Sequence, residues 1–210
     1  SKFAGIPDAI ARAFNLSLAG VEPRVQYVEH HPAHLASAFH TSGLAEAACC
    51  AIDGFGDFVS VSTGHGHGGR IDVLDRVYFP HSLGLLYLAI TQYLGFKNFG
   101  DEFKVMGLAP YGKPTRAEAV RRLLHLERGG HFRLALEFFR HWTGEVTMDW
   151  AAGEPVVPDV YTERLIDLLG PARQPDEPVT TVHEDLAASV QRVFEESAFH
   201  VLGGAHERTG

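Results

Sequence analysis

The chain has 210 residues, a formal net charge of −8 and a hydrophobic content of 45%, a composition typical of one folded globular domain. The acidic balance argues against a generally basic nucleic-acid-binding protein. No stretch reaches the about 20 consecutive apolar residues of a membrane-spanning helix. We therefore expect neither a nucleic acid nor a membrane among its partners.

Two features bear on where the protein acts and on whether the sequence is whole. The beginning of the chain has no apolar core of a signal peptide, and the adjacent Cys49 and Cys50 would point to opposite faces of a strand. A disulfide is therefore not expected, and a cytoplasmic location fits. The sequence does not begin with Met, and we expect it to be part of a longer protein.

The first eighty residues predict helices around a set of paired strands. Pro7 and the apolar residues that follow at helical spacing predict a helix over 7–18 that stops at Gly20. The other elements expected here are a strand over 25–28, a helix over 32–39, strands over 46–52 and 58–64 that form a hairpin, a flexible glycine-rich turn over 64–69 and a strand over 70–79.

The second half of the chain predicts mainly helices. Helical spacing predicts helices over 82–94 and 115–126, and five prolines between 150 and 180 predict loop around a short helix over 161–169. Thr181 and Glu184 have the spacing of a capping box that opens the last helix. The order of strands and helices predicts an α/β domain with a mixed sheet flanked by helices.

Two histidines are spaced one helical turn apart at the expected start of a helix. His30 and His34 would lie on one side of it, which is a spacing that metal ligands use. Alone, the spacing is more typical of surface or capping histidines. A neighbouring His31 and the acid Asp53 at the end of an expected strand favour a metal site, because strand ends line the crevice of an open sheet. Imidazole and carboxylate ligands suit Fe(II), Zn or Mn.

The segment Asp53-Gly54-Phe55-Gly56-Asp57 has two interpretations. Gly and Asp are the residues of a hairpin turn with positive φ. A turn needs neither two acids nor two glycines, so we expect the segment to serve a ligand as well. Its spaced acidic positions do not match a calcium loop.

Glu102 and Lys104 lie in a glycine-punctuated segment over 100–112. Opposite charges two residues apart do not face each other on a helix. We therefore predict an extended segment in which each side chain makes its own contacts, with Lys104 reaching a phosphate or carbamoyl oxygen; a solvated charged pair is the alternative. His65 and His67 are predicted to be exposed rather than to bind a metal.

Four motifs follow one another along the chain: His30-His31-Pro-Ala-His34-Leu-Ala-Ser37-Ala-Phe39, Asp53-Gly-Phe-Gly-Asp57, Ser82-Leu-Gly84-Leu-Leu-Tyr87 and Glu102-Phe-Lys104-Val-Met106-Gly107-Leu-Ala-Pro-Tyr111-Gly112. In this order they resemble the N-terminal domain of the O-carbamoyltransferase family. Members of that family carbamoylate nodulation factors and antibiotics such as cephamycins and aminoglycosides.

The resemblance implies an actin/hexokinase-like (ribonuclease H-like) α/β fold. It also implies an enzyme in which a YrdC-like domain makes carbamoyl-adenylate from carbamoyl phosphate and ATP. The first domain then passes the carbamoyl group to the hydroxyl of a small-molecule acceptor at an iron-type metal site. A metal could polarise the carbamoyl carbonyl while a nearby base helps the alcohol attack.

The family's site residues carry over by position. The metal ligands would be His30, His34 and Asp53, and His31 would orient or deprotonate the acceptor hydroxyl. Glu102 and Lys104 would complete the catalytic set, while Gly54, Gly56 and Asp57 would contact the nucleotide cofactor.

The resemblance also implies that the domain is incomplete at both ends. Residues 1–150 would form the lobe of the metal site, and residues 151–210 a proline-rich connection and a helix leading to a second lobe. The family's opening phosphate hairpin, its second lobe with a fourth metal ligand and its YrdC-like domain have no counterpart here. We expect those parts as partners, and we expect this chain alone to be inactive and to bind ATP poorly.

Two alternatives remain open from the sequence. One is an enzyme like the tRNA threonylcarbamoyl transferase, which shares the implied fold and the paired histidines. The other is an inactive metal-binding module that keeps the fold. An oligomer is compatible with the composition.

Overall fold

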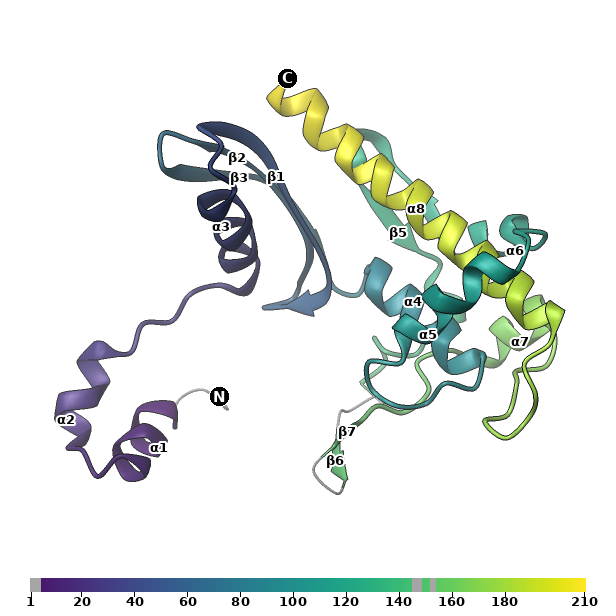
Figure 1. Ribbon diagram of the computed structural model, residues 1–210, viewed down its shortest axis with the longest axis horizontal. Helices are drawn as coiled ribbons and strands as arrows, with labels where there is room; N and C mark the ends of the chain where they lie inside the picture. The colour runs from purple at the N-terminus through teal and green to yellow at the C-terminus, as the bar shows by residue number, and fades with distance from the viewer. Residues whose placement is uncertain (1–4, 145–148, 152–153) are drawn as a thin grey trace.

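Three consecutive strands form the main sheet of the protein (Figure 1). The computed structural model describes residues 5–144, 149–151 and 154–210. β1 (Glu46–Gly56) pairs with β2 (Val59–His67), and β2 pairs with β3 (Arg70–Tyr78), both antiparallel. The predicted hairpin and third strand are confirmed. In the described part of the chain the sheet is antiparallel rather than mixed, because tight turns join its strands directly.

Helices cover both faces of this sheet (Figure 1). On one face lies α3 (His30–Ser42), which packs through Leu35 and Phe39 around Cys49. On the other face lie α4 (Leu83–Tyr93) and α8 (Thr181–Thr209), whose core receives Cys50. The two free cysteines therefore point to opposite faces, as predicted. Burial raises the pKa of Cys50 to about 11, which keeps its thiol protonated.

The glycine-rich segment over 64–69 is strand for most of its length, so the prediction of a flexible turn there is wrong. β2 pairs as far as His67, and only Gly68 and Gly69 turn, with φ values of 54° and 75°. A Cβ on Gly66 would lie 2.5 Å from the Phe39 ring. The glycine is required because α3 packs directly on the strand.

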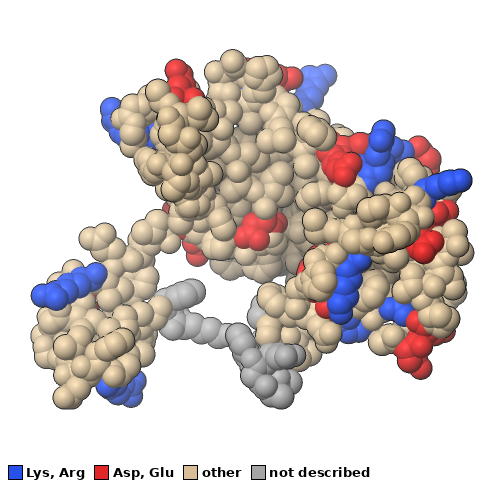
Figure 2. All heavy atoms as spheres, viewed as in Figure 1, with Lys and Arg blue, Asp and Glu red and all other residues tan. Residues whose placement is uncertain are grey.

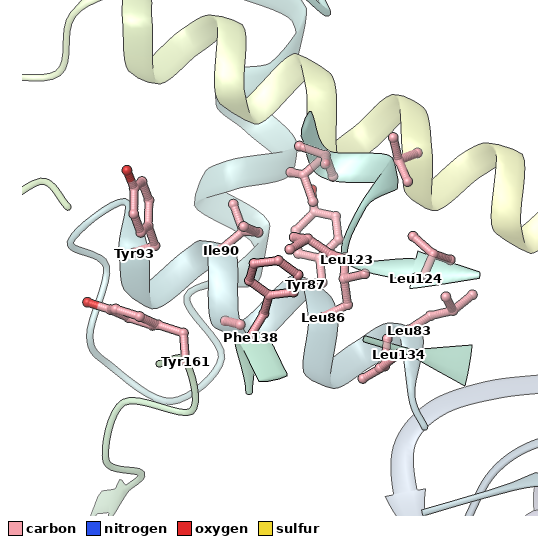
Figure 3. Close-up of a cluster of buried hydrophobic side chains, with 14 of the residues drawn as sticks. Leu83, Leu86, Tyr87, Ile90, Tyr93, Leu123, Leu124, Leu134, Phe138 and Tyr161 are labelled. Carbon is pink, nitrogen blue, oxygen red and sulfur yellow. The ribbon is translucent and has the colours of Figure 1, made fainter. Parts of the chain in front are cut away.

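The largest core lies around α4, which is buried on nearly every side. Leu83 and Leu86 of α4 lie near Leu124 and Leu134, whereas Tyr93 lies beside Tyr161 (Figure 3). Leu124 belongs to β4 (Leu124–Leu126) and Leu134 to β5 (Phe132–Leu134), and these two strands pair antiparallel. The long α8 crosses this cluster and contributes Leu186, Val190 and Val193. Together these contacts tie the second half of the chain to the sheet.

The remaining elements are short: α5 (Glu102–Leu108), α6 (Ala117–Arg121), α7 (Glu163–Leu169), β6 (Asp149–Ala151), β7 (Glu154–Val156) and the 3-10 turns η1 (Glu22–Arg24), η2 (Ala109–Tyr111), η3 (Arg128–Gly130) and η4 (Leu136–Phe138). The short helix expected among the prolines is confirmed as α7. The helix expected over 115–126 is wrong in its second half. There the chain leaves α6 at Arg121 and forms β4, because pairing with β5 buries Leu124 and Phe132.

Two predictions for the first thirty residues are also wrong. The helix expected over 7–18 breaks into α1 (Ile6–Ala13) and α2 (Leu18–Val21), because Asn15 between them has a left-handed φ of 51°. Gly20 lies inside α2. Residues 25–28 form no strand, since no neighbouring strand among the described residues pairs with them. Figure 1 shows α1 and α2 set apart from the sheet.

The last helix begins one residue from the expected position. The N-cap is Thr180, and its backbone N–H donates to His183 Nδ1 over 3.0 Å. The box therefore pairs Thr180 with His183 rather than Thr181 with Glu184. An imidazole nitrogen accepts the hydrogen bond that a Glu side chain usually accepts at this position.

The surface shows charges of both signs. On the face in Figure 2, Lys and Arg side chains stand singly or in small groups among Asp and Glu. Within the described residues, no helix combines the length and the apolar character needed to cross a bilayer. The cytoplasmic location stays a prediction.

We predict that Gly204→Ala destabilises the protein whereas Gly203→Ala does not. A Cβ at Gly204 would lie 2.4 Å from the Gly129 carbonyl oxygen, while a Cβ at Gly203 meets nothing within 4 Å. Overpacking of this kind costs about 1–3 kcal/mol, whereas an exposed Gly→Ala change in a helix is neutral or stabilising. Urea unfolding of the two variants measures the difference. Equal free energies of unfolding would contradict the close packing of α8 on η3.

Candidate metal centre

Two imidazoles and one carboxylate converge at the end of the sheet. His30 Nε2 lies 2.6 Å from Asp53 Oδ2 and 3.0 Å from His34 Nε2. His34 Nε2 lies 3.6 Å from the same carboxylate oxygen. The three predicted metal ligands are thus brought together, with their ligand atoms within 4.8 Å of one another.

The start of α3 positions both histidines. The backbone N–H of His30 donates to Asp57 Oδ2 over 2.8 Å, so the helix begins at His30, two residues before the expected Pro32. Asp57 and Phe58 form the tip of the β1–β2 hairpin with φ values of 51° and 63°. One turn later along the helix, His34 presents its ring on the same side.

The end of β1 positions the carboxylate. Alternation along the strand places Cys49 and Asp53 on the face that α3 covers. The register between β1 and β2 shifts after Ile52, so the next residues of β1 bulge away from the ladder. The Ser82 hydroxyl, at the N-cap of α4, donates to the Asp53 carbonyl oxygen over 3.1 Å. Both helices that flank the site are therefore anchored to this strand end.

Gly56 makes room for the first histidine. A Cβ at this position would lie 2.2 Å from His30 Cγ. The imidazole therefore packs directly on the backbone of β1, and a side chain at Gly56 would displace it. Gly84 has a similar role behind the site, since its Cβ would lie 2.8 Å from the Gly54 Cα.

The carboxylate is held in its charged form. Burial of Asp53 raises its pKa. The hydrogen bonds from His30 and from the Gly54 N–H lower the pKa by more than burial raises it, so the pKa lies below its usual value. The Gly54 N–H donates to Oδ1 over 2.6 Å, which leaves Oδ2 facing the two histidines. Asp53 is thus ready to bind a cation at neutral pH.

The donor set fits a divalent transition metal. His30 Nε2, His34 Nε2 and Asp53 Oδ2 can each bind a proton or a cation, and they lie close enough together for one ion to bind all three. Ligands about 2.1 Å from an ion lie about 3–3.5 Å from one another, close to the separations of 2.6, 3.0 and 3.6 Å. Two histidines with one carboxylate are typical of Fe(II) sites with open positions.

His31 lies beside this group but not in it. Its ring centroid is 5.6 Å from that of His30 and 6.1 Å from that of His34, and the residue is 1% exposed. Burial lowers its pKa more than a backbone interaction with Val59 raises it, so the ring is neutral. A general base must reach the proton that it takes. The role of His31 in catalysis stays a prediction, and its burial favours a positioning role.

Glu102 and Lys104 are placed on a helix, α5, so the prediction of an extended segment is wrong. The two side chains separate as predicted. Lys104 Nζ lies 2.8 Å from Asp101 Oδ1, whose side chain is 7% exposed. Glu102 instead lines a cavity of about 820 Å³ that Asp53 also lines.

The three residues predicted to contact a nucleotide have structural partners of their own. Gly54 and Gly56 sit at close backbone approaches, and Asp57 caps the start of α3. Their contact with a cofactor stays a prediction. In the sequence, the signal for these packing roles is the glycines of the second and third motifs, because a glycine can mark a close backbone approach as well as a turn.

The cavity beside the site was not found from the sequence. Its wall consists chiefly of apolar side chains from β1, α4, α5 and α8. These residues are far apart along the chain, and no short motif contains them. His65 and His67 lie away from it, each 2.8 Å from an acid, Glu46 and Asp72 respectively.

Comparisons with known proteins agree with the order of the motifs. A family model described as the carbamoyltransferase N-terminus matches residues 10–208. The chain is 38% identical over 190 residues to an uncharacterized protein of Synechocystis sp., covering 90% of this chain and 29% of that protein. It is 36% identical to nodulation protein NolNO of Sinorhizobium fredii over 192 residues (90% and 25%) and to nodulation protein NolO of Bradyrhizobium diazoefficiens over 193 residues (87% and 29%).

The chain therefore spans between 25% and 29% of the length of these relatives. The matched region includes the two histidines, Asp53 and most of the cavity wall. The site and the family match thus lie in the same part of the chain.

We predict that His34→Ala lowers the affinity of the chain for Fe(II) and Zn(II) by at least about 100-fold, since a direct ligand matters more than the outer partners that change affinity 10–100-fold. His40→Ala is the control, because His40 is an exposed histidine on the same helix. Calorimetric titration and metal analysis after dialysis measure both. Unchanged metal content in the His34 variant would overturn the ligand assignment.

We also predict that Gly56→Ala weakens metal binding about tenfold or more by displacing His30. Gly54→Ala adds the same methyl group two residues away, where a Cβ meets nothing within 4 Å. It is expected to bind metal as the unchanged chain does. Circular dichroism checks that both variants fold, and equal affinities in the two would refute the packing role of Gly56.

Proposed function

The chain belongs to the carbamoyltransferase family, whose N-terminal part it matches, and from this premise we propose that it carries the transfer site of an ATP-dependent O-carbamoyltransferase. The donor is carbamoyl-adenylate, formed from carbamoyl phosphate and ATP elsewhere in the complete enzyme. The acceptor is a small molecule with a hydroxyl group. The observation that carries this proposal is the convergence of His30, His34 and Asp53, the last of which also lines a large cavity.

The reaction needs a bond from the acceptor oxygen to the carbamoyl carbon and loss of AMP from that carbon. The hydroxyl proton must leave the oxygen as the bond forms. A divalent ion held by His30, His34 and Asp53, for which Fe(II) is the first choice, supplies Lewis-acid polarisation of an oxygen of the donor. The residues of this chain bind and orient the acceptor and take its proton.

We assign the proton acceptor to Glu102. Glu102 and Asp53 both line the cavity, and we place the acceptor hydroxyl between them. His31 is buried and is proposed to hold the start of α3 against the sheet. Lys104 is proposed to contact a phosphate oxygen of the donor, for which its amine must leave Asp101.

The two alternatives have less support. An enzyme acting on tRNA needs basic surface for the phosphate backbone, and the net charge is −8. An inactive metal-binding module makes the same metal prediction but predicts no transfer. Activity therefore separates it from the proposal.

The test uses the protein expressed from the complete reading frame that contains these residues. Carbamoyl phosphate, ATP, Fe(II) and a panel of alcohols are supplied, and mass spectrometry detects the carbamate ester while AMP release is followed. Glu102→Gln is expected to lower kcat by about 10²–10⁴-fold, the range for loss of a general base, with metal content unchanged. Glu118→Gln, an exposed glutamate whose side chain is 91% accessible, should retain activity.

Two results would count against the proposal. If no alcohol is carbamoylated while the metal binds normally, the inactive-module alternative is correct. If transfer occurs but Glu102→Gln leaves kcat unchanged, the assignment of the proton acceptor is wrong.

A further inference from the structure

The cavity beside Asp53 is much larger and more apolar than carbamoyl transfer to a simple alcohol requires. Its volume of about 820 Å³ lies in the range of small-molecule sites, about 300–1,000 Å³. The apolar side chains that line it include Phe55, Phe58, Phe79, Phe99, Met106 and Phe194. Several of them are exposed to an unusual degree for aromatic residues, with 46% for Phe55, 71% for Phe58 and 57% for Phe99.

Most polar side chains that line the cavity either belong to the proposed transfer site or already have a hydrogen-bond partner. Asp53 and Glu102 are the acids of the proposed transfer site. Tyr87 donates its hydroxyl to Gln191 Oε1 over 2.9 Å, so these two side chains pair with each other. His141 also lines the cavity, and its Nδ1 has no hydrogen-bond partner among the described residues; the other side chains of the wall are apolar.

The aromatic wall is preformed. The ring centroids of Phe55 and Phe79 lie 5.1 Å apart, and those of Phe58 and Phe79 lie 6.3 Å apart. The buried His141, which also lines the cavity, has its ring centroid 5.7 Å from that of Phe79, and its Nε2 lies 2.8 Å from the Pro80 carbonyl oxygen. Edge-to-face and tilted pairs at these distances hold one another in place.

We propose that this cavity binds an apolar group of the acceptor, an alkyl chain or an aromatic ring, while the acceptor hydroxyl lies at the Asp53 end. The inference rests on the proposed function and names its substrate class: amphipathic alcohols rather than small polar ones. The apolar group buries the exposed aromatic side chains, and the geometry delivers the hydroxyl to the two acids.

The position of Asp53 favours a small molecule over a covering protein segment. The Asp53 carboxylate contacts His30, and Asp53 is also one of the residues that line the cavity. A segment that filled this space would occupy the room that any acceptor needs beside the metal ligands. A ligand with an apolar tail fills the space and leaves the reacting end accessible.

The experiment compares two acceptors with the same sugar ring: glucose, and octyl glucoside below its micelle concentration, in which an octyl group replaces the hydrogen of the anomeric hydroxyl. Each buried CH₂ raises affinity about fourfold, so octyl glucoside is expected to be preferred by at least tenfold in kcat/KM, through a lower KM. The protein expressed from the complete reading frame is used.

Two matched phenylalanine variants test whether the preference for octyl glucoside arises in the cavity. Phe99→Ala removes a side chain from the cavity wall, whereas Phe103→Ala removes an exposed one, 65% accessible, that lies outside it. Phe99→Ala is expected to raise the KM for octyl glucoside about tenfold and to leave that for glucose unchanged. Phe103→Ala should change neither value.

A binding measurement separates this inference from the proposed function. Calorimetric titration of the chain with octyl glucoside needs no catalysis, and Phe99→Ala but not Phe103→Ala is expected to weaken binding. Absence of any carbamate product rejects the proposed function and leaves the binding result to decide the inference. Equal use of both acceptors, or equal binding by the unchanged chain and both variants, overturns the inference while the transferase proposal stands.

Discussion

The hydrogen bond from the His30 N–H to the Asp57 carboxylate, 2.8 Å long, is the contact on which the site depends. It fixes the start of α3 to the tip of the β1–β2 hairpin, and the same hairpin carries Asp53. Together with the packing of Leu35 and Phe39 on the sheet, it sets the distance from the two histidines to the acid, which lies on a different element. A helix N-terminus offers unpaired N–H groups, and a carboxylate at that position satisfies one of them.

Close backbone approaches complete this arrangement. Gly56 lets the His30 ring rest on β1, Gly66 lets Phe39 rest on β2, and Gly84 brings α4 against Gly54. At each of these positions a side chain would force two packed elements apart. Gly56 and Gly84, two glycines of the sequence motifs, therefore act through packing at the site.

The metal site is polar, whereas the cavity beside it is mainly apolar. The ligand atoms of His30, His34 and Asp53 lie within 4.8 Å of one another and form a polar end. The aromatic wall beyond them forms an apolar end. In the function that we propose, an acceptor that matches both ends is held by burial of its apolar part and presents its hydroxyl to the acids. The proposal thus assigns specificity to the cavity and chemistry to the end of β1.

The sequence by itself determined the local features that depend on neighbouring residues. These are the β-hairpin and its third strand, the one-turn spacing of His30 and His34, the opposite faces of Cys49 and Cys50, and the motif order of the carbamoyltransferase family. Only the tertiary structure decided features that depend on distant partners. Residues 124–126 became a strand because β5 was available to pair. Residues 25–28 did not, because the described part of the chain holds no strand that pairs with them. The cavity likewise arises where four separate elements meet. Its residues share no spacing along the chain, because burial and proximity are properties of the packed molecule rather than of any segment.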